Sequence, residues 1–202
     1  MSADSLLESL GYFGIFLSVF IECGVPLGLI LPLPGWTLLF SAGVLAASDV
    51  MEIPTILAVG MLAAVLGYVA GYYTGYKYGR KLFFEKNTKK YFTADQGRKT
   101  EKFMKKYGPV TLVAGRFLPI VHNLAPILSG VAKTPFLSFI ILGVIGAVLW
   151  VFSGVFLGYF IGQQVPNAPY YVIPAVVVLM LFINTRPGHR FINKMSKKLE
   201  IV

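Results

Sequence analysis

Charged residues are scarce in this chain, and basic ones are missing from its first 76 positions. Only 13% of the 202 residues are charged, against about 25% in an average soluble domain. Hydrophobic residues make up 56%, and the mean hydropathy is +0.71. A soluble chain of 22.2 kDa cannot bury so much apolar surface. The composition therefore predicts an all-α polytopic membrane protein with a single membrane domain, residues 1–202.

Cysteine and histidine are nearly absent as well. Cys23 is the only cysteine, so no internal disulfide can form, and we interpret it as a small packing residue. With two histidines in the chain, a closed metal site is not expected. The serine-elbow, zinc-protease and P-loop motifs of common enzymes are also missing. The sequence thus predicts no metal, no cofactor and no enzymatic activity.

The basic residues are concentrated in two stretches. Eleven lie between Lys77 and Lys106, and five lie between Arg186 and Lys198. Such a distribution is typical of the positive-inside rule and not of nucleic-acid binding. We expect the basic loop, residues 77–106, and the C-terminal tail, residues 186–202, to be cytoplasmic. Both stretches are also suited to anionic lipid headgroups.

Prolines interrupt the first apolar segment. The run before them is shorter than the roughly 20 residues that a span needs, and each proline removes an amide donor and disfavours helix at the residue before it. We expect residues 11–47 to form a re-entrant hairpin with Pro26, Pro32, Pro34 and Gly35 at its tip. The alternative is two ordinary spans with proline kinks.

A second proline-broken segment follows the basic loop. Residues 107–131 predict another re-entrant hairpin, with Pro119 and Pro126 at its tip. Transmembrane helices are expected at residues 54–76 and 136–162, and a last, shorter one at residues 169–185.

The two halves of this pattern resemble each other. Gly67-x-x-x-Gly71-Tyr72-x-x-Gly75 recurs as Gly154-x-x-x-Gly158-Tyr159-x-x-Gly162. Because the basic loop must be cytoplasmic, the first half begins outside and the second begins inside. The halves are therefore expected to be inverted-topology repeats, each a hairpin plus a transmembrane helix, followed by a final C-terminal span. Transporters built this way bind substrate near the middle of the membrane.

Glu22 and Arg116 are the charged residues that precede the two expected tips. Charge at membrane depth is costly and usually functional or paired. Glu22 is a candidate proton carrier, and the planar fork of Arg116 suits a phosphate group. The alternative is a structural ion pair between them that fastens the hairpins. His122, Asn123 and Trp36 are further candidates for the site, with hydrogen bonding to backbone or packing as their alternative roles.

Several motifs together resemble the DedA family, whose relatives include the VTT-domain scramblases. They are Phe20-Ile-Glu22, Pro32-Leu-Pro34-Gly35, Gly115-Arg116-Phe117-x-Pro119 and Gly158-Tyr159-x-x-Gly162. The resemblance implies facing re-entrant hairpins in the cytoplasmic membrane of a bacterium or archaeon. It also implies a lipid flippase that moves undecaprenyl phosphate or a phospholipid, in some members driven by the proton-motive force.

Three positions depart from that family pattern. Trp36 stands where an acid is usual, His122 where a second arginine is usual, and Tyr72 where an aspartate is frequent. Losing an acid and a base together is coherent, since one alone would leave an unpaired buried charge that costs about 3–5 kcal/mol.

The sequence therefore predicts a lipid flippase or scramblase that binds an anionic phosphate headgroup, with proton coupling through Glu22. The alternatives are a proton-driven transporter of small solutes or ions and a non-transporting membrane scaffold. The small-residue helix faces suit packing within the chain and homo-oligomers equally well.

Overall fold

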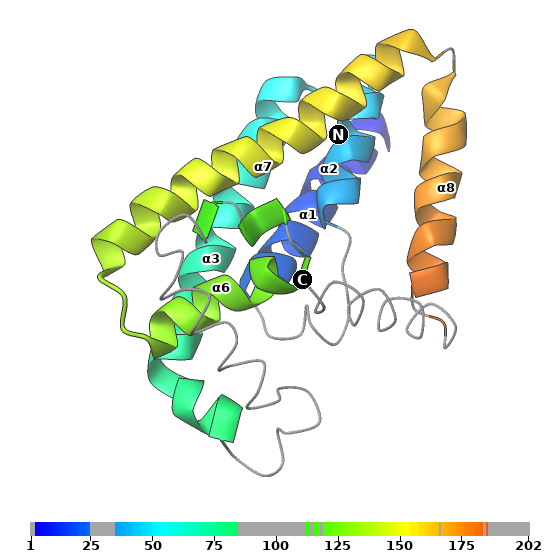
Figure 1. Ribbon diagram of the computed structural model, residues 1–202. Helices are drawn as coiled ribbons and strands as arrows, with labels where there is room; N and C mark the ends of the chain where they lie inside the picture. Colours follow the sequence, from blue (N-terminus) through cyan, green and yellow to red (C-terminus); the bar gives the residue numbers. More distant parts are fainter. Residues whose placement is uncertain are drawn as a thin grey trace.

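The computed structural model describes residues 3–24, 35–84, 112–113, 115–117, 119–165, 167–183 and 185. This part of the chain is helical and contains no strand (Figure 1). Its elements are α1 (Ala3–Gly24), α2 (Gly35–Ala46), α3 (Ile53–Phe84), the 3₁₀ turn η2 (Gly115–Phe117), α6 (Pro119–Val131), α7 (Phe136–Gln164) and α8 (Ala168–Ile183).

Two helices are long and apolar enough to cross a membrane. They are Ile53–Tyr78 within α3 and α7, with 26 and 29 residues. Many of their large apolar side chains, such as Leu62, Ile141 and Leu149, are exposed, as expected for surfaces that face lipid. These helices correspond to the spans expected at residues 54–76 and 136–162. Helix α3 continues beyond the expected end at residue 76 and reaches Phe84, because a helix can extend past its apolar stretch into polar residues.

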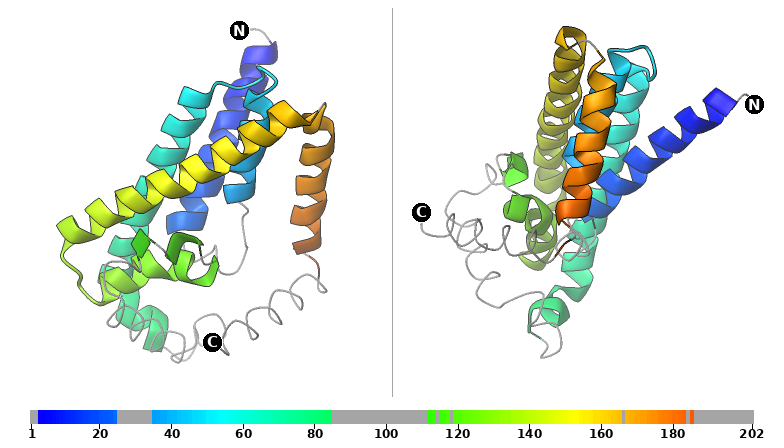
Figure 2. Two further views of the ribbon diagram at one scale, coloured as in Figure 1. Left: turned by 45° about the horizontal axis from the view of Figure 1, so that its top comes forward. Right: turned by 90° about the vertical axis from the view of Figure 1, so that its right-hand side faces the viewer.

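The first expected hairpin is described on both sides of its tip. Helix α1 runs towards the middle of the molecule and α2 returns from it (Figure 2). Helix α1 starts at Ala3, earlier than the expected hairpin start at residue 11, and has 22 residues, whereas α2 has 12. The tip with Pro26, Pro32 and Pro34 lies outside the described residues, and Gly35 is the first residue of α2.

The second expected tip differs from the sequence-based expectation. Pro119 begins α6, and Pro126 lies inside it without breaking it. A proline at the first position of a helix loses no intrahelical bond. Pro126 removes only the amide that would have bonded the carbonyl of His122, and the packing of α6 against α3 holds the helix together around that gap. Helix α6 is thus a continuous 13-residue helix, about half the length of α7.

Glycines allow the two short helices to touch the two long ones. A Cβ on Gly43 of α2 would collide with the backbone of α7 at Val155. A Cβ on Gly130 of α6 would collide with the backbone of α3 at Tyr72. Small residues of this kind permit close helix packing in membranes. Helix α2 therefore lies against α7 and α6 against α3, and α8 folds back beside α2 (Figures 1 and 2).

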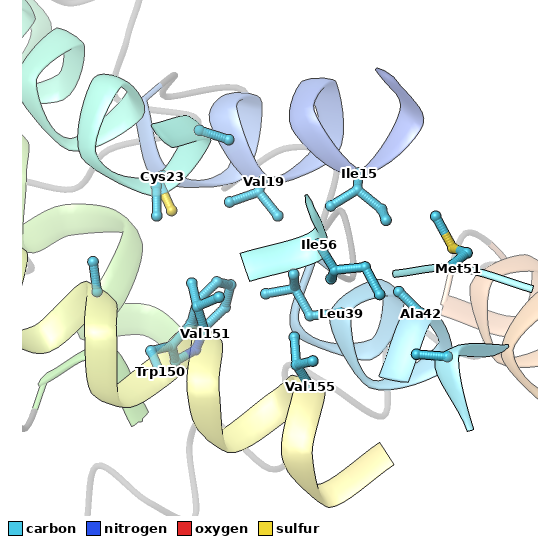
Figure 3. Close-up of a cluster of buried hydrophobic side chains, with 14 residues drawn as sticks. Ile15, Val19, Cys23, Leu39, Ala42, Met51, Ile56, Trp150, Val151 and Val155 are labelled. Carbon is cyan, nitrogen blue, oxygen red and sulfur yellow. The ribbon is translucent and has the colours of Figure 1, made fainter. Parts of the chain in front are cut away.

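The core consists of two clusters of buried side chains. The larger joins α1, α2, α3 and α7, with Ile15, Val19, Cys23, Leu39, Ile56, Trp150, Val151 and Val155 among its members (Figure 3). The smaller joins α3, α6 and α7 through Tyr68, Tyr72, Leu112, Ala125 and Phe139. Arg116, His122 and Cys23 lie where these clusters meet, since Cys23 belongs to the larger and Arg116 covers the Tyr68 ring of the smaller.

Candidate functional site

Arg116 is a buried cation without a carboxylate partner among the described residues. Its side chain is 2% exposed. Nη2 donates to the Gly143 carbonyl oxygen of α7 at 3.1 Å, and the guanidinium lies 4.1 Å from the centroid of the Tyr68 ring. Nε and Nη1 have no hydrogen-bond partner in the described part of the chain. The cation–π contact compensates part of the burial cost, and two donor groups remain for an anion.

The α7 backbone makes room for this guanidinium. A Cβ on Gly146 would lie 3.0 Å from both Cδ and Nε of Arg116. A Cβ on Gly143, one turn earlier, would lie 2.9 Å from Cδ1 of Tyr68, whose ring the guanidinium covers. Glycine at both positions thus leaves room for the arginine and the Tyr68 ring beside α7.

His122 is the second buried polar group of the site. It lies in the first turn of α6 and is 3% exposed. Its ring stacks on Trp150 of α7, with centroids 5.1 Å apart, and its Nε2 lies 3.6 Å from the Cys23 Sγ of α1. Nδ1 has no partner within the described residues, and neither has Oδ1 of the neighbouring Asn123. His122 therefore joins α1, α6 and α7 and keeps one ring nitrogen free.

Glu22 is bonded to a helix end and not to Arg116. Its Oε2 accepts a hydrogen bond from the Gly35 amide, the first of α2, at 2.7 Å. A carboxylate at this position satisfies one of the free amide groups of a helix N-terminus and complements the helix dipole. A Cβ on Gly35 would collide with this oxygen, so a larger residue would push the carboxylate away from the amide. The ion pair between Glu22 and Arg116, which the sequence offered as the alternative role, is not present, because each of these two residues has its own partner.

Trp36 lies apart from the buried cation. Its Nε1 donates to Ser153 Oγ at 3.4 Å, and its ring stacks on Phe40 at 6.0 Å. Trp36 packs against the larger core cluster between α2 and α7. Tyr72 is likewise engaged in packing, and its hydroxyl donates to the Thr134 carbonyl at 2.7 Å. Among the described residues, no hydrogen bond or ring contact joins either of them to Arg116.

Cys23 and Tyr68 are the site residues that sequence reasoning missed. Cys23 follows Glu22 directly, and its Sγ lies 3.6 Å from His122 Nε2. It points from α1 towards Trp150 and Val151 of α7 (Figure 3). Nothing in the sequence distinguishes a lone cysteine in an apolar helix from a packing residue. Tyr68 could have been suspected only as a polar aromatic on the glycine face of α3.

The site can bind an anion by its chemistry. It presents one permanent cation, two free guanidinium donor groups and an imidazole nitrogen at the junction of five elements, α1, α3, α6, α7 and η2. No group of three or more His, Cys, Asp or Glu residues that could hold a metal occurs within the described residues.

Comparison with known proteins places this arrangement in a family. The VTT domain model matches residues 33–160. The chain is 34% identical to protein DedA of Escherichia coli over 151 residues, covering 73% of this chain and 67% of DedA. It is 30% identical to a membrane protein of Mycobacterium tuberculosis over 194 residues, covering 93% of this chain and 81% of the relative.

A further relative has a more specific name. Undecaprenyl phosphate transporter A of Bacillus subtilis is 28% identical over 190 residues, covering 88% of this chain and 89% of the relative. No solved structure was found to match the chain. On the domain match and on the similarity to DedA, the chain belongs to the VTT-domain (DedA) family of membrane proteins.

Proposed function

We propose that this protein moves a phosphate-bearing lipid, such as undecaprenyl phosphate or a phospholipid, across the cytoplasmic membrane. The observation that carries the proposal is Arg116, a guanidinium that is 2% exposed, has no carboxylate partner among the described residues and keeps Nε and Nη1 free. A phosphate oxygen pair matches such a fork in geometry and charge. The name of the Bacillus subtilis relative agrees with a lipid phosphate as ligand.

The reciprocal packing of the short helices supports a pair of inverted repeats. Gly158 of α7 lies against the backbone of α2 at Phe40, and Gly75 of α3 lies against the backbone of α6 at Ile127. Each short helix thus packs on the long helix of the other half. In transporters of this design the two halves tilt against each other around a central site. The headgroup would pass through that site while its tail remains in the bilayer.

The charge distribution supports one orientation. The end of α3 with Lys77 and the α6–α7 turn with Lys133 carry exposed basic residues. The opposite turn carries Asp49 and Glu52. We place the basic end in the cytoplasm of a bacterial cell. A reporter that fluoresces only in the cytoplasm should fluoresce when it is fused after residue 202. A fusion that is expressed at a normal level but does not fluoresce would contradict this orientation.

Transport by reconstituted protein tests the proposal. Liposomes that contain the protein and a fluorescent phospholipid are treated with a quencher that cannot cross the bilayer. We expect the wild type to expose inner-leaflet lipid and Arg116→Ala to slow this exchange at least about tenfold, since a hydrogen bond to a charged group contributes about 1.5–3 kcal/mol.

The matched control is Lys133→Ala, which removes an exposed cation from the α6–α7 turn. It should exchange lipid at the wild-type rate. Exchange at that rate by a folded Arg116→Ala protein would overturn the proposal. So would exchange of a phosphate-free diacylglycerol at the same Arg116-dependent rate.

A further inference from the structure

Cys23 and His122 form a buried contact that has no role in the transport step proposed above. Sγ and Nε2 lie 3.6 Å apart, within hydrogen-bonding range for sulfur. The two side chains are 1% and 3% exposed. They come from the last turn of α1 and the first turn of α6, so the contact joins the two expected hairpins.

The contact can be made in two ways. A neutral imidazole has one N–H and one acceptor nitrogen. If Nε2 carries the hydrogen, it donates to a weak sulfur acceptor and the thiol hydrogen has no partner. If the thiol donates, its hydrogen meets the stronger acceptor, and the ring hydrogen is then on Nδ1. The second arrangement gives the thiol hydrogen the stronger acceptor and leaves Nδ1–H available to a ligand, since Nδ1 has no partner among the described residues.

Nδ1 is the ring nitrogen without a partner in the described chain. We propose that Cys23 is a positioning residue that holds His122 in the tautomer with its hydrogen on Nδ1. Nδ1–H then adds a third donor to Nε and Nη1 of Arg116 for the phosphate of the lipid headgroup. The partner of one ring nitrogen commonly fixes what the other can bind. This inference rests on the proposed function for its ligand but not for its tautomer.

Nitrogen NMR of the full chain in lipid bilayers tests the tautomer. The chain has two histidines, so ¹⁵N-histidine labelling gives two ring systems, and His189→Gln leaves that of His122. We expect the wild type to carry hydrogen on Nδ1 alone. Cys23→Ala should shift the population towards Nε2–H, and Cys23→Ser, whose hydroxyl also donates, should retain Nδ1–H.

Val19→Ala is the matched control, because Val19 is a buried member of the same α1 face and makes no hydrogen bond through its side chain. It should leave the tautomer unchanged. A wild-type ring with hydrogen on Nε2 or on both nitrogens would overturn the inference. So would a tautomer that is the same in Cys23→Ala.

Transport kinetics give a second, separate readout. Cys23→Ala should raise the apparent KM for a phosphate lipid about two- to tenfold, the range for one neutral hydrogen bond, with Cys23→Ser close to wild type. If Arg116→Ala leaves transport intact, the proposed function fails while the tautomer result stands. If transport depends on Arg116 but the His122 tautomer is unchanged in Cys23→Ala, this inference fails and the proposed function stands.

Discussion

Glu22 has a hydrogen-bond partner in the structure that the sequence did not predict. Sequence reasoning identified it as an acid next to a chain interruption and offered two roles for it, a proton carrier and, as the alternative, a structural ion pair with Arg116. In the structure it bonds the Gly35 amide at the start of α2. The amide groups of a helix N-terminus offer partial positive charge to a carboxylate, as a guanidinium does, and no sequence pattern distinguishes the two when the chain between them is long.

The contact between Glu22 and Gly35 predicts a non-additive pair of substitutions. Gly35→Ala should destabilise the protein by about 1–3 kcal/mol, because the new Cβ would collide with Oε2 of Glu22. In the Glu22→Ala background the same change should cost much less, since the clash is gone. Thermal unfolding in detergent, followed by the fluorescence of the two tryptophans, measures both. Equal costs in the two backgrounds would contradict the contact.

At the scale of elements, apolar length was a reliable guide and proline was not. The two long apolar runs are helices α3 and α7. Pro126, expected at a chain break, instead lies inside α6. Proline costs a helix one hydrogen bond and some steric strain, and tertiary packing on α3 can offset that cost. Whether a proline breaks a helix depends on the residues that pack against it in the fold, and these cannot be read from the sequence.

Because α6 packs closely on α3, the loss of stability on replacing a glycine by valine should depend strongly on where the glycine lies. Gly130→Val should destabilise the protein severely, because its side chain would enter the α3 backbone at Tyr72. Gly14 of α1 has no atom within 4 Å of an added Cβ, so Gly14→Val should change the melting temperature little. Similar melting temperatures for the two variants would show that α6 does not pack on α3 as described.

At the scale of the whole molecule, a polar junction is enclosed by two apolar clusters. Composition alone indicated a membrane protein, and the glycine repeat indicated two related halves. The sequence could not give the partners of Arg116: Tyr68 precedes it by 48 positions and Gly143 follows it by 27. These contacts arise from the packing of α3 and α7 around η2, and they leave the guanidinium with two free donor groups.

The lipid that remains bound to the purified protein tests that central feature most directly. Native mass spectrometry of the wild type should detect a phosphate-bearing lipid on the protein after the surrounding lipid has been removed. Arg116→Ala should lose it, with affinity lower by about 10- to 100-fold, while Lys133→Ala should keep it. Equal retention of the lipid by folded Arg116→Ala protein would contradict the account.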